Sequence, residues 1–185
     1  MVFLLTVGLT FCQKTAEQNF TKGVEYAAEG NFKKATKELE KVLRVEPTHK
    51  SAKRFLIIIK DVNEQKIQTK TAVSFFKGAT YALKGQWDEA IGEYTKAMEI
   101  EPTYAMPYIS RGNAYVYKDQ YDQAIIDFNK AIEVNPKFVK AYTDRGLVHM
   151  EQLGNKQKAC SDWKRACELG ECYHYTIGQR NGDCE

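Results

Sequence analysis

"GATYALKGQWDEAIGEYTKAMEIEP" (residues 78–102) and "GNAYVYKDQYDQAIIDFNKAIEVNP" (residues 112–136) decide the fold of this chain, because they carry one pattern in the same register. Each opens on a glycine, and Gly78, Gly112 and Gly146 recur every 34 positions. Pro102 and Pro136 close the two stretches and are separated by the same interval. A repeat of this length indicates stacked helical hairpins rather than a single closed core.

Each glycine is followed by companions at fixed distances. An aromatic residue or histidine lies three positions on, an alanine about twelve on and a second aromatic about sixteen on. The sets are Tyr81, Ala90 and Tyr94; Tyr115, Ala124 and Phe128; and His149, Ala159 and Trp163, the last stretched by one inserted residue. An earlier copy consists of Gly23, Tyr26, Ala35, Leu39 and Pro47, and the interval from its glycine to Gly78 is one period plus an extra segment.

The repeated residues have physical roles that fit a helical hairpin. We expect Gly112 and Ala124 to let two helices approach closely. Tyr115 and Phe128 would fill the gap between neighbouring hairpins. Pro136 would stop the second helix, because proline lacks the amide hydrogen and clashes with the preceding turn.

These residues resemble the tetratricopeptide repeat family, over roughly residues 16–170. The resemblance implies an all-α solenoid of helical hairpins, with about four repeats and one interrupting helix. The expected divisions are an export or lipoprotein-type signal at 1–12, repeats at 16–49, 71–104, 105–138 and 139–170, an interrupting helix at 50–70, and a cysteine-containing capping tail at 171–185.

The interruption at 50–70 contains no glycine or proline. It predicts either two helices broken near residues 69–71 or one long helix, and Thr71 as an N-cap favours the break. The run Phe55–Ile59 is too apolar to be solvated on all sides. We expect it to cap the first hairpin and join it to the later three.

Composition limits the function classes. The net charge is +3 and no segment concentrates basic residues among aromatics, so nucleic acid is not an expected partner. The three histidines, His49, His149 and His174, are scattered, and phosphate-binding glycine loops and nucleophile motifs are missing. We therefore expect no enzyme activity, no cofactor, no metal and no small-molecule substrate.

The opening stretch, "MVFLLTVGLTF", carries no charge, and Cys12 follows it. The stretch is too short to span a bilayer and has the size of the apolar core of an export signal. With Cys12, it resembles a bacterial lipoprotein signal, which implies lipidation of Cys12 and location in the bacterial cell envelope (the periplasm), with membrane contact only through the lipid. The alternative is an apolar first helix of a cytoplasmic protein.

The other four cysteines lie close to the carboxyl terminus: Cys160, Cys167, Cys172 and Cys184. Cys160 and Cys167 are about 10 Å apart along one helix, too far for a disulfide. With Gly170 reversing the chain, we hypothesise the pairs Cys167–Cys172 and Cys160–Cys184, which would staple a cap over the last repeat. The alternative is a metal-binding or thiol-active cluster that includes His174.

In the family that the sequence resembles, the first helices of successive hairpins line a concave groove that holds a peptide or partner helix. The resemblance implies a mainly apolar groove for a protein or peptide partner. Its residues would be Phe75, Ala79, Ala82, Met106, Ile109, Asn113, Val116, Tyr117, Lys140, Thr143, Leu147 and Met150. Phe75, Ile109 and Leu147 could equally serve as internal packing contacts.

One type of family member grips acidic C-terminal tails with lysine, asparagine and arginine side chains on the groove. Asn113 and Lys140 match that pattern, but Phe75, Ser110 and Asp144 stand where cationic or amide groups are wanted. We therefore do not expect this chain to bind acidic tails in that way.

Overall fold

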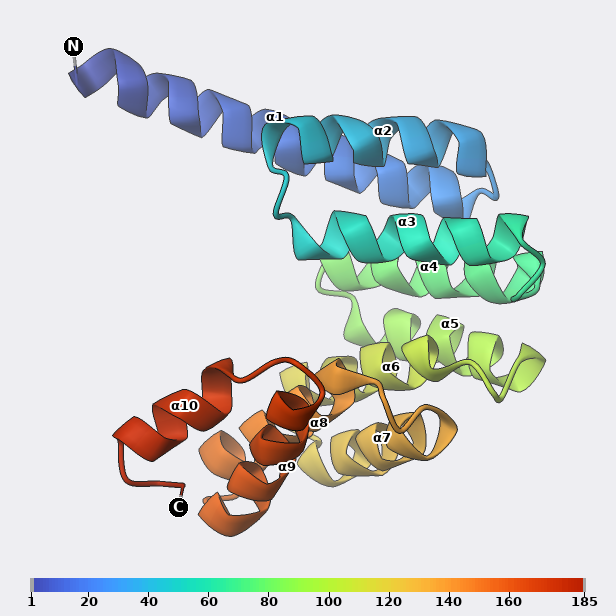
Figure 1. The fold of residues 1–185 in the computed structure, drawn as a ribbon. Coiled ribbons are helices and arrows are strands. Elements are labelled where there is room, and N and C mark those ends of the chain that lie inside the picture. Colours follow the sequence, from blue (N-terminus) through green and yellow to red (C-terminus); the bar gives the residue numbers. More distant parts are fainter. Residues whose placement is uncertain (1, 185) are drawn as a thin grey trace. The chain divides into compact units, whose positions relative to one another are not determined.

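The computed structural model describes residues 2–184, with side chains from residue 13 onward. Over that range the chain forms ten α-helices and one π-helical turn (Figure 1). Their bounds are α1 Val2–Ala28, α2 Phe32–Val45, α3 Lys50–Asn63, α4 Thr69–Leu83, α5 Trp87–Ile100, α6 Ala105–Tyr117, α7 Tyr121–Val134, α8 Val139–Leu147, η1 Val148–Gln152, α9 Lys156–Glu168 and α10 Tyr173–Arg180. The all-helical hairpin fold is confirmed, and the chain divides into two compact units, residues 1–101 and 102–185.

The first unit contains two helical hairpins and one additional helix. α1 pairs with α2, α4 pairs with α5, and α1 also packs against α4. The additional helix, α3, packs mainly against α2 (Figure 1). Phe55 of α3 contacts Phe20 of α1 and both Phe75 and Phe76 of α4, with ring centroids 5.3–5.9 Å apart. The interrupting helix therefore connects the first hairpin to the second, as predicted for the apolar run.

The segment forms two helices and not one long helix, but the break between them lies earlier than predicted. Residues 64–68 separate the helices, and Gln65 adopts a left-handed φ of 57°. α4 begins at Thr69, so the prediction of Thr71 as N-cap is wrong. Thr71 is fully buried inside the first turn of α4, because its side chain faces the packed side of the helix. In the apolar run, Ile58 and Ile59 are buried, whereas Ile57 is 57% exposed.

The repeated glycines mark the closest approach of the two helices in each hairpin. A Cβ atom built on Gly112 would lie 2.7 Å from the ring of Phe128, and one on Gly78 would lie 2.6 Å from Tyr94. The ring of Phe128 thus packs on the glycine of its own hairpin. The missing side chain of Gly112 provides the space for this ring within the hairpin.

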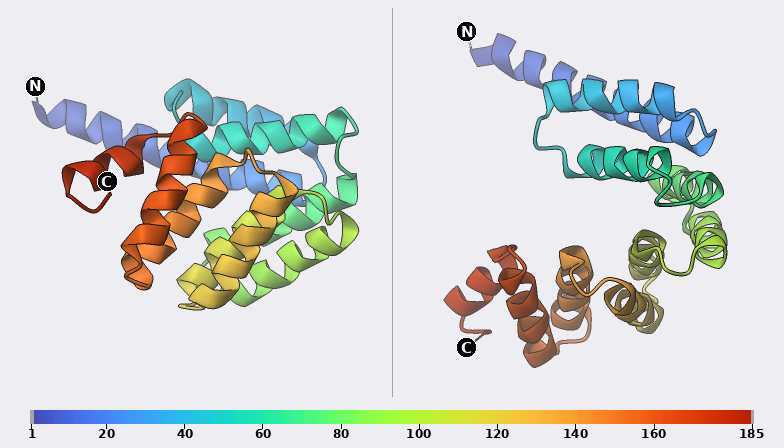
Figure 2. Two further views of the ribbon diagram at one scale, coloured as in Figure 1. Left: turned by 60° about the horizontal axis from the view of Figure 1, so that its bottom comes forward. Right: turned by 45° about the vertical axis from the view of Figure 1, so that its right-hand side comes forward.

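The second unit contains α6 paired with α7, α8 and η1 paired with α9, and α10 packed against α9 (Figure 2). The π-helical turn η1 lies within the stretch that holds one extra residue relative to the earlier repeats. A π turn accommodates an added residue by widening one turn of a helix. After η1, α9 still pairs with α8, and the Trp163 ring contacts Gly146 as in the other hairpins.

The end of the chain turns back at Gly170, which has φ +105°. The Gly170 amide donates to Cys167 O and the Glu171 amide to Ala166 O, each at 2.9 Å, which is a Schellman ending of α9. The structure joins Cys167 to Cys172 and Cys160 to Cys184, with Cα atoms 3.9 and 5.4 Å apart. These are the hypothesised pairs, and the capping tail contains a helix, α10, which the sequence analysis did not predict.

Two sequence predictions concern the amino terminus. The side chains of residues 1–12, and with them the predicted signal and the lipidation of Cys12, lie outside the described residues. Among the helices that the structure does describe, none combines the length and apolarity needed to cross a bilayer.

Candidate partner-binding site

The predicted groove residues divide into buried and accessible sets. Phe75, Ala79, Met106 and Ile109 are no more than 9% exposed. Phe75 packs against Phe55, Phe76 and Tyr94. The assignment of these four side chains to a binding surface is therefore corrected, because the adjacent helices already cover them.

The other predicted groove residues stay at least partly accessible: Ala82, Asn113, Val116, Tyr117, Lys140, Thr143, Leu147 and Met150. Tyr117 is the most exposed, at 68%. Leu147 and Met150 also pack against the cluster of Ala159, Trp163 and Cys184. The accessible part of the prediction therefore lies mostly in the second unit, on α6, α8 and η1.

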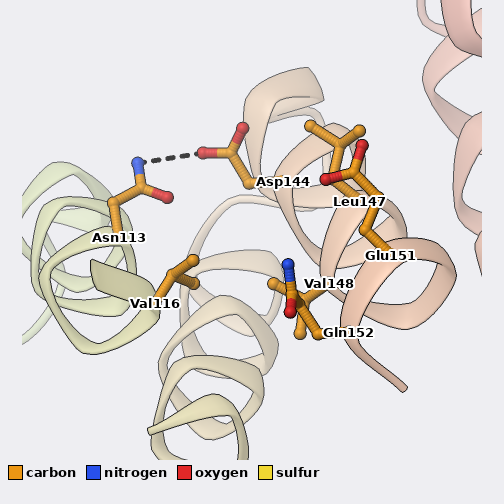
Figure 3. Close-up of a pocket in the computed structure, with 7 residues that line it drawn as sticks. All are labelled: Asn113, Val116, Asp144, Leu147, Val148, Glu151 and Gln152. Atoms are coloured by element: carbon orange, nitrogen blue, oxygen red, sulfur yellow. Dashed lines mark hydrogen bonds between the residues drawn. The ribbon is translucent and has the colours of Figure 1, made fainter. Parts of the chain in front are cut away.

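A pocket of about 170 Å³ opens on this surface. It is lined by Asn113, Val116, Asp144, Leu147, Val148, Glu151 and Gln152 (Figure 3). Asn113 and Val116 come from α6, Asp144 and Leu147 from α8, and the remaining three from η1. The sequence analysis placed Asn113, Val116 and Leu147 on the binding surface and missed the other four.

A polar network holds one side of this pocket. Figure 3 shows Asn113 facing Asp144, and the Asn113 amide donates to Asp144 Oδ2 at 3.0 Å. Lys140 Nζ donates to Asp144 Oδ1 at 2.8 Å from one turn earlier on α8. The Asp144 side chain is only 11% exposed. A nearly buried carboxylate is stable when it is paired in this way. Asp144 therefore engages the two groove residues that match the acid-binding pattern, Asn113 and Lys140.

The π-helical turn supplies the other side of the pocket. Glu151 and Gln152 belong to η1 and are exposed. Within residues 13–184, Glu151 has no ion-pair or hydrogen-bond partner. The one-residue insertion between Gly146 and Ala159 was visible in the sequence, and it was the available signal for this departure from the repeat.

Buried ion pairs keep the pocket-bearing helices in place. Arg111 of α6 donates two hydrogen bonds to Asp127 of α7, both at 2.8 Å. Arg145 of α8 pairs with Asp162 of α9 in the same bidentate manner. The hydrogen bond to Asp127 raises the pKa of Arg111 above its ordinary value. Bidentate pairing fixes orientation as well as distance, so each pocket helix is held against its hairpin partner.

Besides the Arg–Asp pairs, a tyrosine–proline hydrogen bond recurs in two repeats, and the sequence analysis did not predict it. The hydroxyl of Tyr108 donates to Pro102 O, and the hydroxyl of Tyr142 donates to Pro136 O, each at 3.1 Å. Both tyrosines lie near the start of a first helix, and both prolines precede that helix. The recurrence of Tyr at the same interval as the repeated glycines was the signal that could have revealed this tie.

The three histidines serve in a helix cap, a ring stack and a buried packing position. His49 caps α3, where its Nδ1 accepts from the Ala52 amide at 3.1 Å. His174 stacks on Trp163 at 5.5 Å between ring centroids. His149 is 7% exposed, its Nδ1 has no partner among the described residues, and burial lowers its pKa. No group of three His, Cys, Asp or Glu side chains is placed to hold a metal within the described part of the chain.

Comparisons with known proteins agree with the repeat pattern. A family profile described as "TPR repeat" matches residues 78–118 and 112–152, and one described as "Tetratricopeptide repeat" matches residues 16–49. No curated protein matches the sequence significantly.

Solved structures resemble the chain over part of its length. The first TPR of Spaghetti (RPAP3), bound to the HSP90 peptide SRMEEVD, is 32% identical with a TM-score of 0.57, over 60% of this chain and 89% of that one. The first TPR domain of human RPAP3 is 31% identical with a TM-score of 0.56, over 60% and 88%. The TPR2B domain of yeast Sti1, in a complex named for pHsp70, is 26% identical with a TM-score of 0.55, over 63% and 92%.

Proposed function

Because the chain belongs to the tetratricopeptide repeat family, we propose that it is a non-catalytic interaction scaffold that binds a protein or peptide segment. The observation that carries the proposal is the pocket between α6 and the α8–η1 segment. It combines apolar side chains, Val116, Leu147 and Val148, with a few fixed polar groups, which is the usual composition of a specific binding site.

Structural relatives support this proposal. The Spaghetti domain holds the HSP90 peptide SRMEEVD, the yeast Sti1 domain is in a complex with pHsp70, and both folds match this chain. Helical repeats of this kind expose successive first helices as a continuous partner surface. The accessible surface here comprises α6, α8 and η1, with Tyr117 at its most exposed point.

The test uses a phage-displayed library of random heptapeptides, selected on the immobilised full chain. The pocket variant carries Asn113→Ala, which changes a lining residue, and Tyr117→Ala, which changes the exposed ring one turn further along α6. The control carries Ile126→Ala, since Ile126 is 64% exposed on α7 and does not line the pocket. We expect enriched peptides to lose at least tenfold in affinity for the pocket variant and to bind the control unchanged. Equal affinity for all three proteins, with equal melting temperatures, would count against the pocket as the binding site.

We also propose that the chain acts in the bacterial cell envelope, held there by a lipid on Cys12. The uncharged run before Cys12 and the paired cysteines near the other end support an oxidising location. Intact-mass measurement of protein from the producing cell tests this. Loss of the segment before Cys12, a lipid increment on Cys12 and four masked thiols would support it, and an uncut chain with five free thiols would refute it.

A further inference from the structure

Building on the proposed function, we infer that the pocket between α6 and α8–η1 selects partner segments that have a Lys or Arg next to an apolar side chain and no neighbouring acidic residue. It excludes the acidic tails that related structures hold. The inference names the partner class for the same surface, so it depends on the proposed function being correct.

The two groups that could hold an acidic ligand are already occupied. Asn113 and Lys140 are the two donors that match the acid-binding pattern, and both are engaged by the Asp144 carboxylate at 2.7–3.0 Å. An incoming carboxylate would have to displace Asp144, which is nearly buried and would then lose its partners. It would also meet the negative charge of Asp144 at close range.

One charged side chain at the pocket, Glu151, has no compensating partner among the described residues. Lys140 balances Asp144, so Glu151 is the uncompensated charge among the residues that line the pocket. Its carboxylate is exposed and has no ion-pair partner in the described range 13–184. A cationic side chain placed at this rim would gain an ion pair and would retain access to water.

The size of the pocket suits one apolar side chain. Its volume of about 170 Å³ is close to the roughly 150 Å³ of a dry protein cavity that holds a benzene ring. Val116, Leu147 and Val148 provide the apolar lining. The pocket therefore has room for one side chain such as Leu or Met, with the neighbouring residue of the partner reaching Glu151.

The test compares two labelled heptapeptides by fluorescence anisotropy on the full chain. One is SRMEEVD, the peptide held by a structural relative. The other is SRMKKVK, in which Lys replaces the three acidic residues, so that both peptides keep the Arg–Met pair and the same apolar residues. We expect SRMKKVK to bind at least tenfold more tightly than SRMEEVD. Its affinity should fall as salt is raised from 50 to 500 mM, because the exposed ion pair is screened.

Two variants locate the effect. Glu151→Gln should weaken SRMKKVK by about threefold to fivefold, which is the range of a single exposed ion pair. The matched control Glu171→Gln removes an exposed carboxylate that does not line the pocket and should change nothing. Asp144→Asn should raise the affinity for SRMEEVD, because Lys140 is then unpaired. Melting temperatures of all variants exclude unfolding as the cause.

The preference for basic peptides and the binding of peptides as such can fail separately in these experiments. Library peptides that depend on Asn113 and Tyr117 but are acidic, or tighter binding of SRMEEVD than of SRMKKVK, would overturn the inference and leave the scaffold function standing. Unchanged SRMKKVK binding in Glu151→Gln would also overturn it. Failure of the library to yield any peptide that depends on the pocket would count against both.

Discussion

Gly112 shows how one missing side chain sets the separation of two helices. The ring of Phe128 occupies the space where a Cβ atom would stand, and Phe128 is fully buried. The same arrangement holds at Gly78 with Tyr94 and at Gly146 with Trp163, so the glycine is required by packing and not by backbone freedom.

Gly112→Ala is therefore expected to destabilise the chain, although alanine favours helices. Overpacking against Phe128 costs about 1–3 kcal/mol, which exceeds the gain of about 1 kcal/mol in helix propensity. Gly92→Ala is the matched control, because a Cβ at Gly92 in α5 would meet nothing within 4 Å. That variant should gain about 0.5–1 kcal/mol. Urea unfolding measures both, and a stabilised Gly112→Ala protein would refute the packing role.

Because His149 is buried, we expect the stability of the fold to depend on pH. Burial lowers its pKa below the ordinary 6.5, so the folded chain keeps the imidazole neutral where the unfolded chain would protonate it. The stability is fully present above pH 6.5 and is lost as the pH falls below it, by at most about 1.4 kcal/mol per pH unit.

Replacing His149 by Phe removes this titration and retains an aromatic ring at the repeat position. We expect the fall in melting temperature between pH 7 and pH 5 to be smaller for His149→Phe than for the original chain. Melting at pH 7.5 serves as the reference for each protein. An identical fall in both proteins would show that His149 does not couple folding to pH.

At the residue level, the sequence could reveal what recurs. The close approach of the helices at Gly112 was predictable because the glycines repeat every 34 positions, whereas the packing of Phe128 on that glycine was not predicted. The burial of Phe75 and Ile109 was not predictable, because both lie on first helices whose neighbours decide which side is covered. Asp144 was noted only as a departure from a pattern, since a single sequence does not show that its carboxylate reaches Asn113 and Lys140.

At the level of elements, the two cysteine pairs close loops of different length. Cys160 and Cys184 are separated by 24 residues, and Cys167 and Cys172 by 5. The longer loop includes α10, and Cys184 packs with Trp163 and Ala159. The longer link therefore holds the terminal helix over the last hairpin.

Removing the longer link should cost more stability. Loop-closure entropy gives about 3.5 kcal/mol for Cys160–Cys184 and about 2 kcal/mol for Cys167–Cys172. The variants are Cys160→Ser with Cys184→Ser, and Cys167→Ser with Cys172→Ser, compared by urea unfolding without reductant. Equal losses, or no loss on reduction of the original chain, would contradict the stapling role.

Element boundaries were predictable where a strong signal ended a helix. Pro136 and Gly170 act as stops, and α7 and α9 end just before them. The break between α3 and α4 was left open, because residues 64–68 contain neither glycine nor proline and Gln65 adopts its left-handed φ without a sequence signal. Helix α10 was missed because its eight residues have no cap or clear apolar stripe of their own.

At the level of the whole molecule, each compact unit carries one tryptophan, Trp87 in α5 and Trp163 in α9. In repeat proteins each repeat contacts only its neighbours, so stability can differ along the chain. The family and the helical-hairpin architecture were predictable from the repeats, whereas the division after Glu101 was not, because the repeat period continues across it.

Local stability along the chain can be measured with the two tryptophans. Trp87→Phe and Trp163→Phe each leave a single tryptophan, whose emission is excited selectively at the red edge of the absorption band. In a background lacking Cys160 and Cys184, we expect the unfolding midpoint reported by Trp163 to fall more than that reported by Trp87. Equal shifts at both positions would show that all repeats unfold as one cooperative body.

The widened turn at residues 148–152 has a consequence for how such a chain can diversify. In an uninterrupted α-helix, one surplus residue would rotate everything after it by about 100° around the axis. Here the surplus is absorbed before Gly154, and α9 still meets α8 through Gly146 and Trp163. The contacts between α8 and α9 therefore stay on the same faces of the two helices. Glu151 and Gln152 lie on a π-helical turn, which no other hairpin has within the described part of the chain. A single inserted residue can thus give one repeat a surface that differs from the others, without any substitution at the positions that pack the repeats together.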